Sequence, residues 1–387
     1  MQKGMLVHIC CSVDSHYFLQ EIQKLYPHTP LTGFFYNPNI HPKEEHDLRL
    51  LDVKRSCMAL NIPLLEGDYT LEAWMQAVRG LEQEKEKGKR CNVCFDVRLE
   101  VSAQMALMLG SKRFSTTLLS SPMKEQEVLK AQGETIAKKY GLEFVYVNVR
   151  AKGGVEKQNA LAKKDKLYRQ NYCGCVFALE KQRQAQDKPC TELISPLNRQ
   201  IHPTSVTSRL ELFKQRQELE AKAQNYQLLQ QNLQTYLLLR GYANTKGEVI
   251  ASQILAHSAT KKAKIKDLQI AKTTLKPTLA EEILCKRLDI LPPTLEINLG
   301  FSPKDDTLFL DTAGVAHILN TPQTPVKSLK LTYKQELYLR EKIAGAESIQ
   351  PIFIVQDLNA LLGGVVEVEI TAAFFEQKNF YLLQTIS

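Results

Sequence analysis

The sequence predicts an α/β protein with a largely parallel sheet, followed by a helical arm and a small α+β extension. Short apolar runs alternate with amphipathic segments from residue 5 to residue 149, a pattern typical of strand–helix–strand units. The pattern changes after residue 204. Because 387 residues exceed the size of most single cores, two domains are expected.

The first strand–helix unit opens the chain. An apolar run from Met5 to Ile9 predicts a buried strand, and a Cys-Cys-Ser turn follows it. A second strand is expected over residues 31–36, ending in a loop that begins at Asn37. Between the two strands, apolar residues recur at helical spacing, at Phe18, Leu19, Ile22 and Leu25.

Three more strands and four more helices are expected in the same domain. The strands are residues 62–69, 113–119 and 142–149. The helices are residues 43–60, 70–88, 91–110 and 124–141. Ligands of a parallel sheet bind at the carboxyl ends of its strands, so the chemistry is expected there.

The rest of the chain differs in character. Residues 205–245 are Gln-rich with apolar residues at helical spacing, which predicts a helical segment between a catalytic domain (1–204) and an extension (246–387). The extension contains no catalytic motif. Its expected strands are residues 295–301, 306–314, 328–339, 349–358 and 364–386.

Composition limits the class of protein. The chain is 44% hydrophobic and 24% charged, as in ordinary globular proteins. No run reaches the roughly 18 apolar residues of a membrane span, and His8 and Asp14 interrupt any signal-peptide core. We therefore expect a cytoplasmic protein with no membrane partner. Nine cysteines in a reducing compartment indicate metal or redox chemistry rather than disulfides.

Six of the nine cysteines form three close pairs. An adjacent pair rarely forms its own disulfide because the geometry is strained, and a C-x-x-C pair on a helix can chelate one ion or one edge of a cluster. The pairs are Cys10 with Cys11, Cys91 with Cys94, and Cys173 with Cys175.

Each pair alone also has a structural explanation. Buried thiols pack as small apolar side chains, and C-x-x-C is commonly half of a zinc site. Three pairs at strand ends or helix starts of one domain are harder to explain by packing, and we interpret them as a metal or redox site. Cys57, Cys190 and Cys285 have no close partner in the sequence and are interpreted as structural.

Polar residues near these pairs have two interpretations each. Asp14 either caps the first helix or is an oxygen ligand to iron. Glu45 and Arg49 form a simple i,i+4 ion pair or a polar wall of a ligand cleft. Thr116 and Thr117 cap a helix or face a substrate.

Five motifs, in order, resemble the epoxyqueuosine reductase QueH family: HICCSVD, YNPNIHP, RCNVCFDVRL, TTLLSSP and YRQNYCGC, between residues 8 and 175. The resemblance implies a nucleotide-hydrolase-like (HUP, Rossmann-like) scaffold. It also implies the cobalamin-independent reduction of epoxyqueuosine to queuosine at the wobble position of tRNA. The implied partners are tRNA carrying epoxyqueuosine and an external electron donor.

The resemblance also implies the cofactors, a [4Fe-4S] cluster and either a mononuclear iron or redox-active thiols beside it. In one assignment the cluster ligands are Cys10, Cys11, Cys91 and Cys94, the redox pair is Cys173 with Cys175, and Asp14 is catalytic. In another, Asp14, one of the first two cysteines and one thiol of the Cys-Gly-Cys segment hold the mononuclear iron. The implied substrate contacts are Tyr36, Asn37, His41, Arg98, Thr116, Thr117, Tyr168, Arg169 and Gln170.

Removing an epoxide oxygen requires two electrons and two protons, whereas one iron–sulfur cluster passes one electron at a time. A second redox or Lewis-acid centre is therefore expected. Two other functions fit the cysteines: a zinc-stapled RNA-binding protein and a tRNA sulfur-transfer enzyme. The latter needs a glycine-rich phosphate loop after the first strand, where this chain has CCSVDS.

Overall fold

The computed structural model describes residues 4–122, 124–193, 202–292 and 294–384. These residues fall into two compact units. One lies within residues 1–194, 205–231 and 380–387, and the other within residues 195–204 and 232–379. No helix among the described residues is both long and apolar enough to span a membrane.

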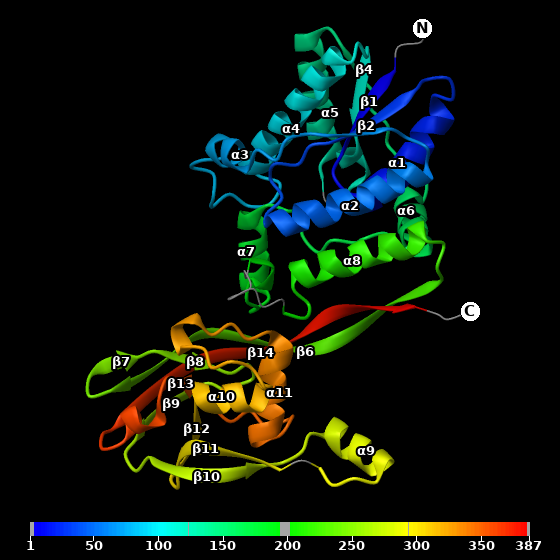
Figure 1. Ribbon diagram of the computed structural model, residues 1–387. Coiled ribbons are helices and arrows are strands. Elements are labelled where there is room, and N and C mark those ends of the chain that lie inside the picture. The colour runs from blue at the N-terminus through cyan, green and yellow to red at the C-terminus, as the bar shows by residue number, and fades with distance from the viewer. Residues whose placement is uncertain (1–3, 123, 194–201, 293, 385–387) are drawn as a thin grey trace. The chain divides into compact units, whose positions relative to one another are not determined.

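The N-terminal unit is built on a five-stranded parallel sheet (Figure 1). Its order is β3-β2-β1-β4-β5, so the first strand is central. Every residue of β1 is buried, as expected for a parallel strand covered on both faces. The strands are β1 (Met5–Ile9), β2 (Leu31–Phe35), β3 (Leu64–Glu66), β4 (Arg113–Thr116) and β5 (Glu143–Phe144).

Helices pack against this sheet in two groups. Helix α1 contacts α2 and α6, while α4 contacts α5, and Figure 1 shows α4 and α5 on the opposite side of the strands from α1. The helices are α1 (Ser12–Leu25), α2 (Lys43–Ala59), α3 (Leu71–Ala77), α4 (Lys89–Met108), α5 (Gln126–Tyr140), α6 (Gly154–Lys164), α7 (Val176–Ala185) and α8 (Val206–Ala221).

The C-terminal unit contains two sheets. One has the order β10-β11-β12-β13-β8, and the other β7-β6-β14-β9. The first combines β8 (Ser252–Ile254), β10 (Gln269–Leu275), β11 (Leu295–Ser302), β12 (Asp305–Asp311) and β13 (Ile352–Val355). The second combines β6 (Tyr226–Thr245), β7 (Glu248–Ile250), β9 (Lys261–Ile265) and β14 (Val366–Gln384). The helices are α9 (Leu279–Leu288), α10 (Thr312–Leu319) and α11 (Tyr333–Ala344).

The structure contradicts the helical prediction for the second half of residues 205–245. Helix α8 ends at Ala221, and β6 follows as a strand. In the sheet, β6 lies between β7, which follows it directly, and β14, which is far along the chain. Local spacing of apolar residues carries no information about such a partner.

Three smaller predictions also need correction. The expected strand at 328–339 is wrong, because α11 begins after Thr332, which forms a reciprocal capping box with Gln335. The helix expected at 70–88 ends at Ala77. The strand expected at 142–149 is confined to β5, and most of the remaining residues form no regular structure.

A buried polar cluster joins α8 to the sheet domain. The Asp52 carboxylate on α2 pairs with Arg216 on α8, and both side chains are fully buried. The same carboxylate accepts hydrogen bonds from the Ser12 hydroxyl (2.5 Å) and the Tyr168 backbone N–H (2.7 Å). One charge therefore connects the start of α1, the segment before the Cys-Gly-Cys sequence, and α8.

Replacing Asp52 with Ala should destabilise the N-terminal unit by about 3–5 kcal/mol, because Arg216 would remain buried without its counter-charge. Urea unfolding followed by circular dichroism measures the change. The matched control is Lys54→Ala, which removes an exposed ion pair with Glu66 and should cost about 0–1 kcal/mol. Equal losses for the two variants would refute the role of the Asp52 cluster.

Candidate active site

The carboxyl ends of the central strands place the first thiol pair. Cys10 follows β1 directly, and Cys11 is the N-cap of α1. At the end of the neighbouring strand β4, the Thr117 hydroxyl accepts the Cys10 backbone N–H at 3.1 Å and lies 3.3 Å from Cys10 Sγ. The parallel pairing of β1 with β4 thus fixes Cys10 beside the threonines.

Cys10, Cys11 and Asp14 form a compact set of potential metal ligands. One ligand atom from each lies within 4.8 Å of the others. The Cys10 thiol donates to Asp14 Oδ2 at 3.3 Å, and Gln158 donates to Asp14 Oδ1 at 2.9 Å. Burial raises the pKa of Asp14, although the hydrogen bonds from Cys10, Cys11 and Gln158 oppose this effect. Two thiols and one carboxylate are a donor set that can hold a transition-metal ion.

The other four clustered thiols line a second, small cavity. Cys91 and Cys94 lie one turn apart at the start of α4, and Cys175 is the N-cap of α7. Cys173 precedes Cys175 in an extended loop, and together with Cys91 and Cys94 these thiols face one space. All nine cysteines of the chain are free thiols. Four convergent thiols match the ligand count of a [4Fe-4S] cluster.

Positive charge favours the thiolate form of Cys173. The hydrogen bond from the Cys175 thiol, followed by the charges of Lys124 and Arg49, lowers the pKa of Cys173 well below its usual value. The same hydrogen bond raises the pKa of Cys175. Burial alone would lower the pKa of Lys124, but its interactions with Cys173, Cys91 and Cys94 raise it overall. Lys124 is therefore held as a cation beside the thiols.

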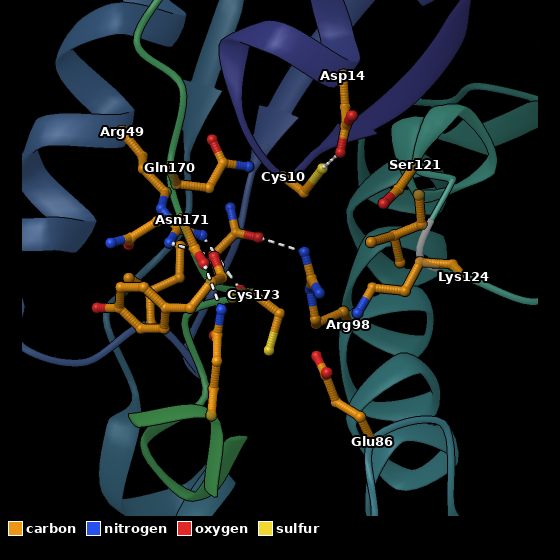
Figure 2. A pocket seen from close by; sticks show the side chains of 15 residues that line it. Cys10, Asp14, Arg49, Glu86, Arg98, Ser121, Lys124, Gln170, Asn171 and Cys173 are labelled. Carbon is orange, nitrogen blue, oxygen red and sulfur yellow. Dashed lines mark hydrogen bonds between the residues drawn. The ribbon is translucent and has the colours of Figure 1, made fainter. Parts of the chain in front are cut away.

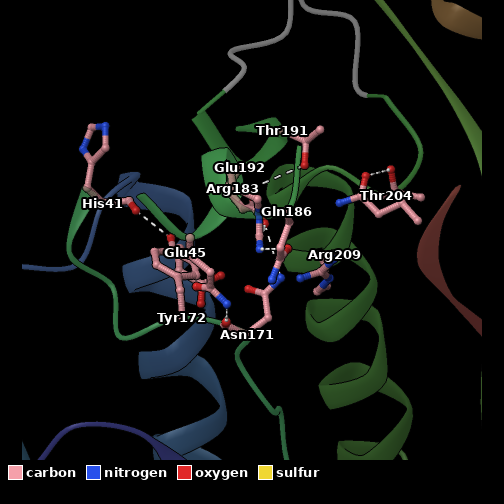
Figure 3. A network of polar contacts seen from close by, with 12 residues as sticks. His41, Glu45, Asn171, Tyr172, Arg183, Gln186, Thr191, Glu192, Thr204 and Arg209 are labelled. Atoms are coloured by element: carbon pink, nitrogen blue, oxygen red, sulfur yellow. Dashed lines mark hydrogen bonds and ion pairs between the residues drawn. The ribbon is translucent and has the colours of Figure 1, made fainter. Parts of the chain in front are cut away.

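A buried ion pair holds the Cys-Gly-Cys loop in place. Arg49 donates to Glu45 at 2.8 Å and also to the backbone carbonyls of Tyr172 (3.0 Å) and Cys173 (3.1 Å). The Tyr172 hydroxyl donates to the carbonyl of His41 at 2.6 Å (Figure 3). Both interpretations of Glu45 and Arg49 apply. The two residues form an i,i+4 ion pair, and Arg49 also lines a cavity of about 370 Å³ that lies next to the four thiols.

Glycine is required between the two thiols of this loop. Gly174 has a φ of +106°, a region that favours glycine. A Cβ at this position would lie 2.7 Å from Ile40 Cγ1 and 3.2 Å from Ile40 Cα. The Cys-x-Cys spacing therefore depends on the absence of a side chain at residue 174.

A polar cavity of about 370 Å³ adjoins these thiols (Figure 2). Figure 2 shows Cys10 with Asp14 at one end and Cys173 between Asn171 and Arg98. The Arg98 guanidinium donates to Asn37 Oδ1 at 2.5 Å, and Asn37 donates to the carbonyl of Ile9 at 2.8 Å. The residues that line this cavity include Cys10, Asp14, Asn37, Ile40, Arg49, Arg98, Ser121, Lys124, Gln170, Asn171, Tyr172 and Cys173.

Several residues predicted to contact substrate do not line this cavity. Tyr36 donates to or accepts from Thr70, and Tyr168 donates to Glu45. Arg169 is exposed and bonded to Asn159. His41 contributes its backbone to the Cys-Gly-Cys loop, while Thr116 contacts His8 and Thr117 contacts Cys10. Asn37, Arg98 and Gln170 are the three that line the cavity.

The sequence carried no signal for Lys124, Gln158 or Trp74. Lys124 follows a strand-end loop, and Gln158 reaches Asp14 from α6, which follows a stretch predicted as strand. Trp74 lies on a short helix and lines the four-thiol cavity. Only the fold brings these residues to the thiols.

The fold and the site define a class, an α/β protein whose parallel sheet gathers thiols suited to iron–sulfur or mononuclear metal chemistry. A family model described as epoxyqueuosine reductase QueH matches residues 5–181. The epoxyqueuosine reductase QueH of Helicobacter pylori is 40% identical over 391 residues, covering 98% of this chain and all of that protein. This chain belongs to the QueH family.

Other relatives match a smaller part of the chain. The epoxyqueuosine reductase QueH of Thermotoga maritima is 36% identical over 183 residues, which are 46% of this chain and 92% of that protein. The solved U34-tRNA thiolase NcsA from Methanococcus maripaludis with its [4Fe-4S] cluster is 12% identical, with a TM-score of 0.32 over 57% of this chain and 68% of that chain. That likeness is too low to support a conclusion.

Gly174→Ala should displace the Cys-Gly-Cys loop and lower the free energy of unfolding by about 1–3 kcal/mol, because the new methyl group meets Ile40. Urea unfolding followed by circular dichroism measures the change. Gly80→Ala is the control, since Gly80 also has a positive φ but open space around it. Equal losses for the two variants would contradict the steric argument.

His8 predicts a pH dependence of stability. Its Nε2–H donates to the carbonyl of Tyr36 and its Nδ1 accepts from Thr116, and burial, followed by the charge of Arg98, keeps its pKa well below the usual value. The unfolded chain therefore binds one more proton below about pH 6.5. Stability should fall as the pH drops below this value, by up to about 1.4 kcal/mol per unit.

Urea unfolding of the full chain between about pH 5 and pH 7 tests this dependence. For the His8→Gln variant, the change of unfolding free energy with pH should correspond to the uptake of roughly one proton fewer on unfolding. Identical slopes for the two proteins would show that His8 is not the responsible group.

Proposed function

We propose that this protein reduces epoxyqueuosine in tRNA to queuosine. The reaction consumes two electrons and two protons and releases the epoxide oxygen as water. The observation that carries the proposal is that two groups of thiols meet at one cavity. Cys10 and Asp14, which lie beside Cys11, line it together with Cys173, and Cys173 also lines the smaller cavity with Cys91, Cys94 and Cys175. The larger cavity has a volume of about 370 Å³, within the range of small-ligand pockets, so it suits a single modified nucleoside rather than a duplex.

The donor groups support two metal sites. We assign Cys91, Cys94, Cys173 and Cys175 to a [4Fe-4S] cluster, because they line one cavity. We assign Cys10, Cys11 and Asp14 to a mononuclear iron, because their ligand atoms lie within 4.8 Å of one another. The cluster supplies single electrons, and the iron supplies a Lewis acid. The assignment with Cys10, Cys11, Cys91 and Cys94 around the cluster is the competing prediction.

Residues of the chain orient the substrate and balance its charge. Arg98, fixed by Asn37, and Gln170 offer hydrogen bonds to the base and sugar. The Lys124 ammonium faces the same cavity and stabilises negative charge that develops on the departing oxygen.

The scaffold and the surface support tRNA as substrate. The sheet order 3-2-1-4-5 with parallel strands agrees with a HUP, Rossmann-like domain. Helix α6 reaches the site through Gln158 and carries exposed lysines that suit phosphate contacts. The wobble nucleotide would leave its stack to enter the cavity. An external electron donor restores the reduced state.

Mass spectrometry of tRNA nucleosides from a strain without this gene tests the function. We expect epoxyqueuosine to accumulate and complementation to restore queuosine. Unchanged queuosine, in a strain with no other reductase, would refute the proposal and favour a zinc-stapled RNA-binding protein.

Two cysteine variants distinguish the ligand assignments. Cys175→Ser should remove acid-labile sulfide and most iron, because the cluster loses a ligand. Cys11→Ser should keep the sulfide and lose about one iron. Iron and sulfide analysis after anaerobic purification measures both. The opposite result, in which Cys11→Ser loses the sulfide and Cys175→Ser keeps it, would favour the competing assignment.

A further inference from the structure

The four-thiol cavity has N–H donors in its wall that lack acceptors. Trp74 Nε1 and the Nε and Nη2 atoms of Arg90 have no hydrogen-bond partner among the described residues. Both side chains line this cavity and are 1% exposed. A buried donor without a partner destabilises the fold, so such groups are uncommon unless a ligand accepts from them.

Arg90 is held from one side only. Its Nη1 donates to the carbonyls of Leu81 (3.2 Å), Glu82 (2.7 Å) and Glu84 (2.8 Å). No carboxylate among the described residues pairs with it, and a buried charge without a counter-charge is unfavourable. Arg90 and Cys175 line the same cavity, so the two groups are close. An anionic centre on the thiols would supply the missing counter-charge.

Trp74 belongs to the same wall. It packs with Cys94 and Cys175 in one apolar cluster, and its ring stacks on Phe177 with a centroid distance of 6.3 Å. The Arg90 guanidinium lies over the other partner of this stack, 5.5 Å from the Phe177 ring centre. The indole N–H can donate a hydrogen bond but cannot accept one, so it needs an acceptor beside it.

We propose that Trp74 Nε1–H and the free edge of Arg90 donate hydrogen bonds to the sulfurs of the centre held by these four cysteines, and thereby raise its reduction potential. The identity of that centre rests on the proposed function. Hydrogen bonds and positive charge stabilise the reduced, more negative state more than the oxidised state. One such bond already exists, from the Lys87 backbone N–H to Cys91 Sγ at 3.2 Å.

Trp74→Phe tests the proposal, because it keeps an aromatic ring and removes the N–H. Iron and sulfide content should stay unchanged. The midpoint potential, from an anaerobic redox titration followed by electron paramagnetic resonance, should fall. A tenfold weaker preference for the reduced state corresponds to about 59 mV for a one-electron couple. Phe95→Leu, which removes a ring that lines the same cavity but no donor, should leave the potential nearly unchanged.

Arg90 allows a second comparison. Arg90→Lys keeps the charge and loses the fork of donors, whereas Arg90→Gln loses the charge. The fall in potential should be larger for Arg90→Gln than for Arg90→Lys. Equal potentials in the wild type, Trp74→Phe and Arg90→Gln proteins, all with full iron and sulfide, would overturn the proposal.

A measurement on the unaltered protein covers variants that fail to load iron. Proton electron-nuclear double resonance of the reduced centre should detect exchangeable protons coupled to it in addition to the one from the Lys87 backbone N–H. Trp74 is the only tryptophan, so deuteration of its N–H can be followed in parallel as one indole resonance. No coupled exchangeable proton beyond that of Lys87, or reconstituted protein without an iron–sulfur centre, would overturn the proposal. A shifted potential in a protein that leaves epoxyqueuosine unreduced would refute only the proposed function.

Discussion

The buried ion pair of Arg49 with Glu45 holds the segment that carries two of the six clustered thiols. One guanidinium satisfies a carboxylate and two backbone carbonyls of the Cys-Gly-Cys loop, and both side chains are at most 3% exposed. The loop has little regular structure of its own. Its position next to α4 therefore depends on contacts from α2, and the glycine at residue 174 allows the backbone to pass Ile40 closely.

Around this loop, the parallel sheet brings distant parts of the chain together. The first thiol pair comes from the end of β1, the second from the start of α4 and the third from the segment before α7. These elements meet because carboxyl ends of parallel strands and the helices that follow them share one edge of a sheet. Lys124 and Arg98 place positive charge at the same edge, and the charge of Lys124 adds to the hydrogen bond from Cys175 in lowering the pKa of Cys173.

The sequence predicted the periodic elements and the clustered cysteines well. The strand Met5–Ile9 is confirmed, and the predicted helices near α2, α4 and α5 differ from the observed ones by at most two residues at each end. The spacing of apolar residues and the positions of glycines predict such local structure directly. Cysteine spacing identified three pairs but not their grouping, since spacing says nothing of which pairs face the same cavity.

What the sequence could not predict depends on contacts between distant residues. Strand β6 is stabilised by its neighbour β14, and its spacing alone resembled a helix. Tyr168 and Arg169 stand directly before the Cys-Gly-Cys sequence, yet Tyr168 packs on Phe213 and Arg169 faces outward. Along the sequence, Trp74 and Arg90 lie far from the third thiol pair. Their missing acceptors become visible only in three dimensions.

The most direct test is anaerobic incubation of reduced, iron-loaded protein with tRNA that carries epoxyqueuosine, followed by mass spectrometry of the nucleosides. The account predicts that queuosine forms with the iron-loaded protein and not with metal-free or zinc-loaded protein. Persistent epoxyqueuosine, with a chain that holds both iron and sulfide and with excess reductant present, would contradict it.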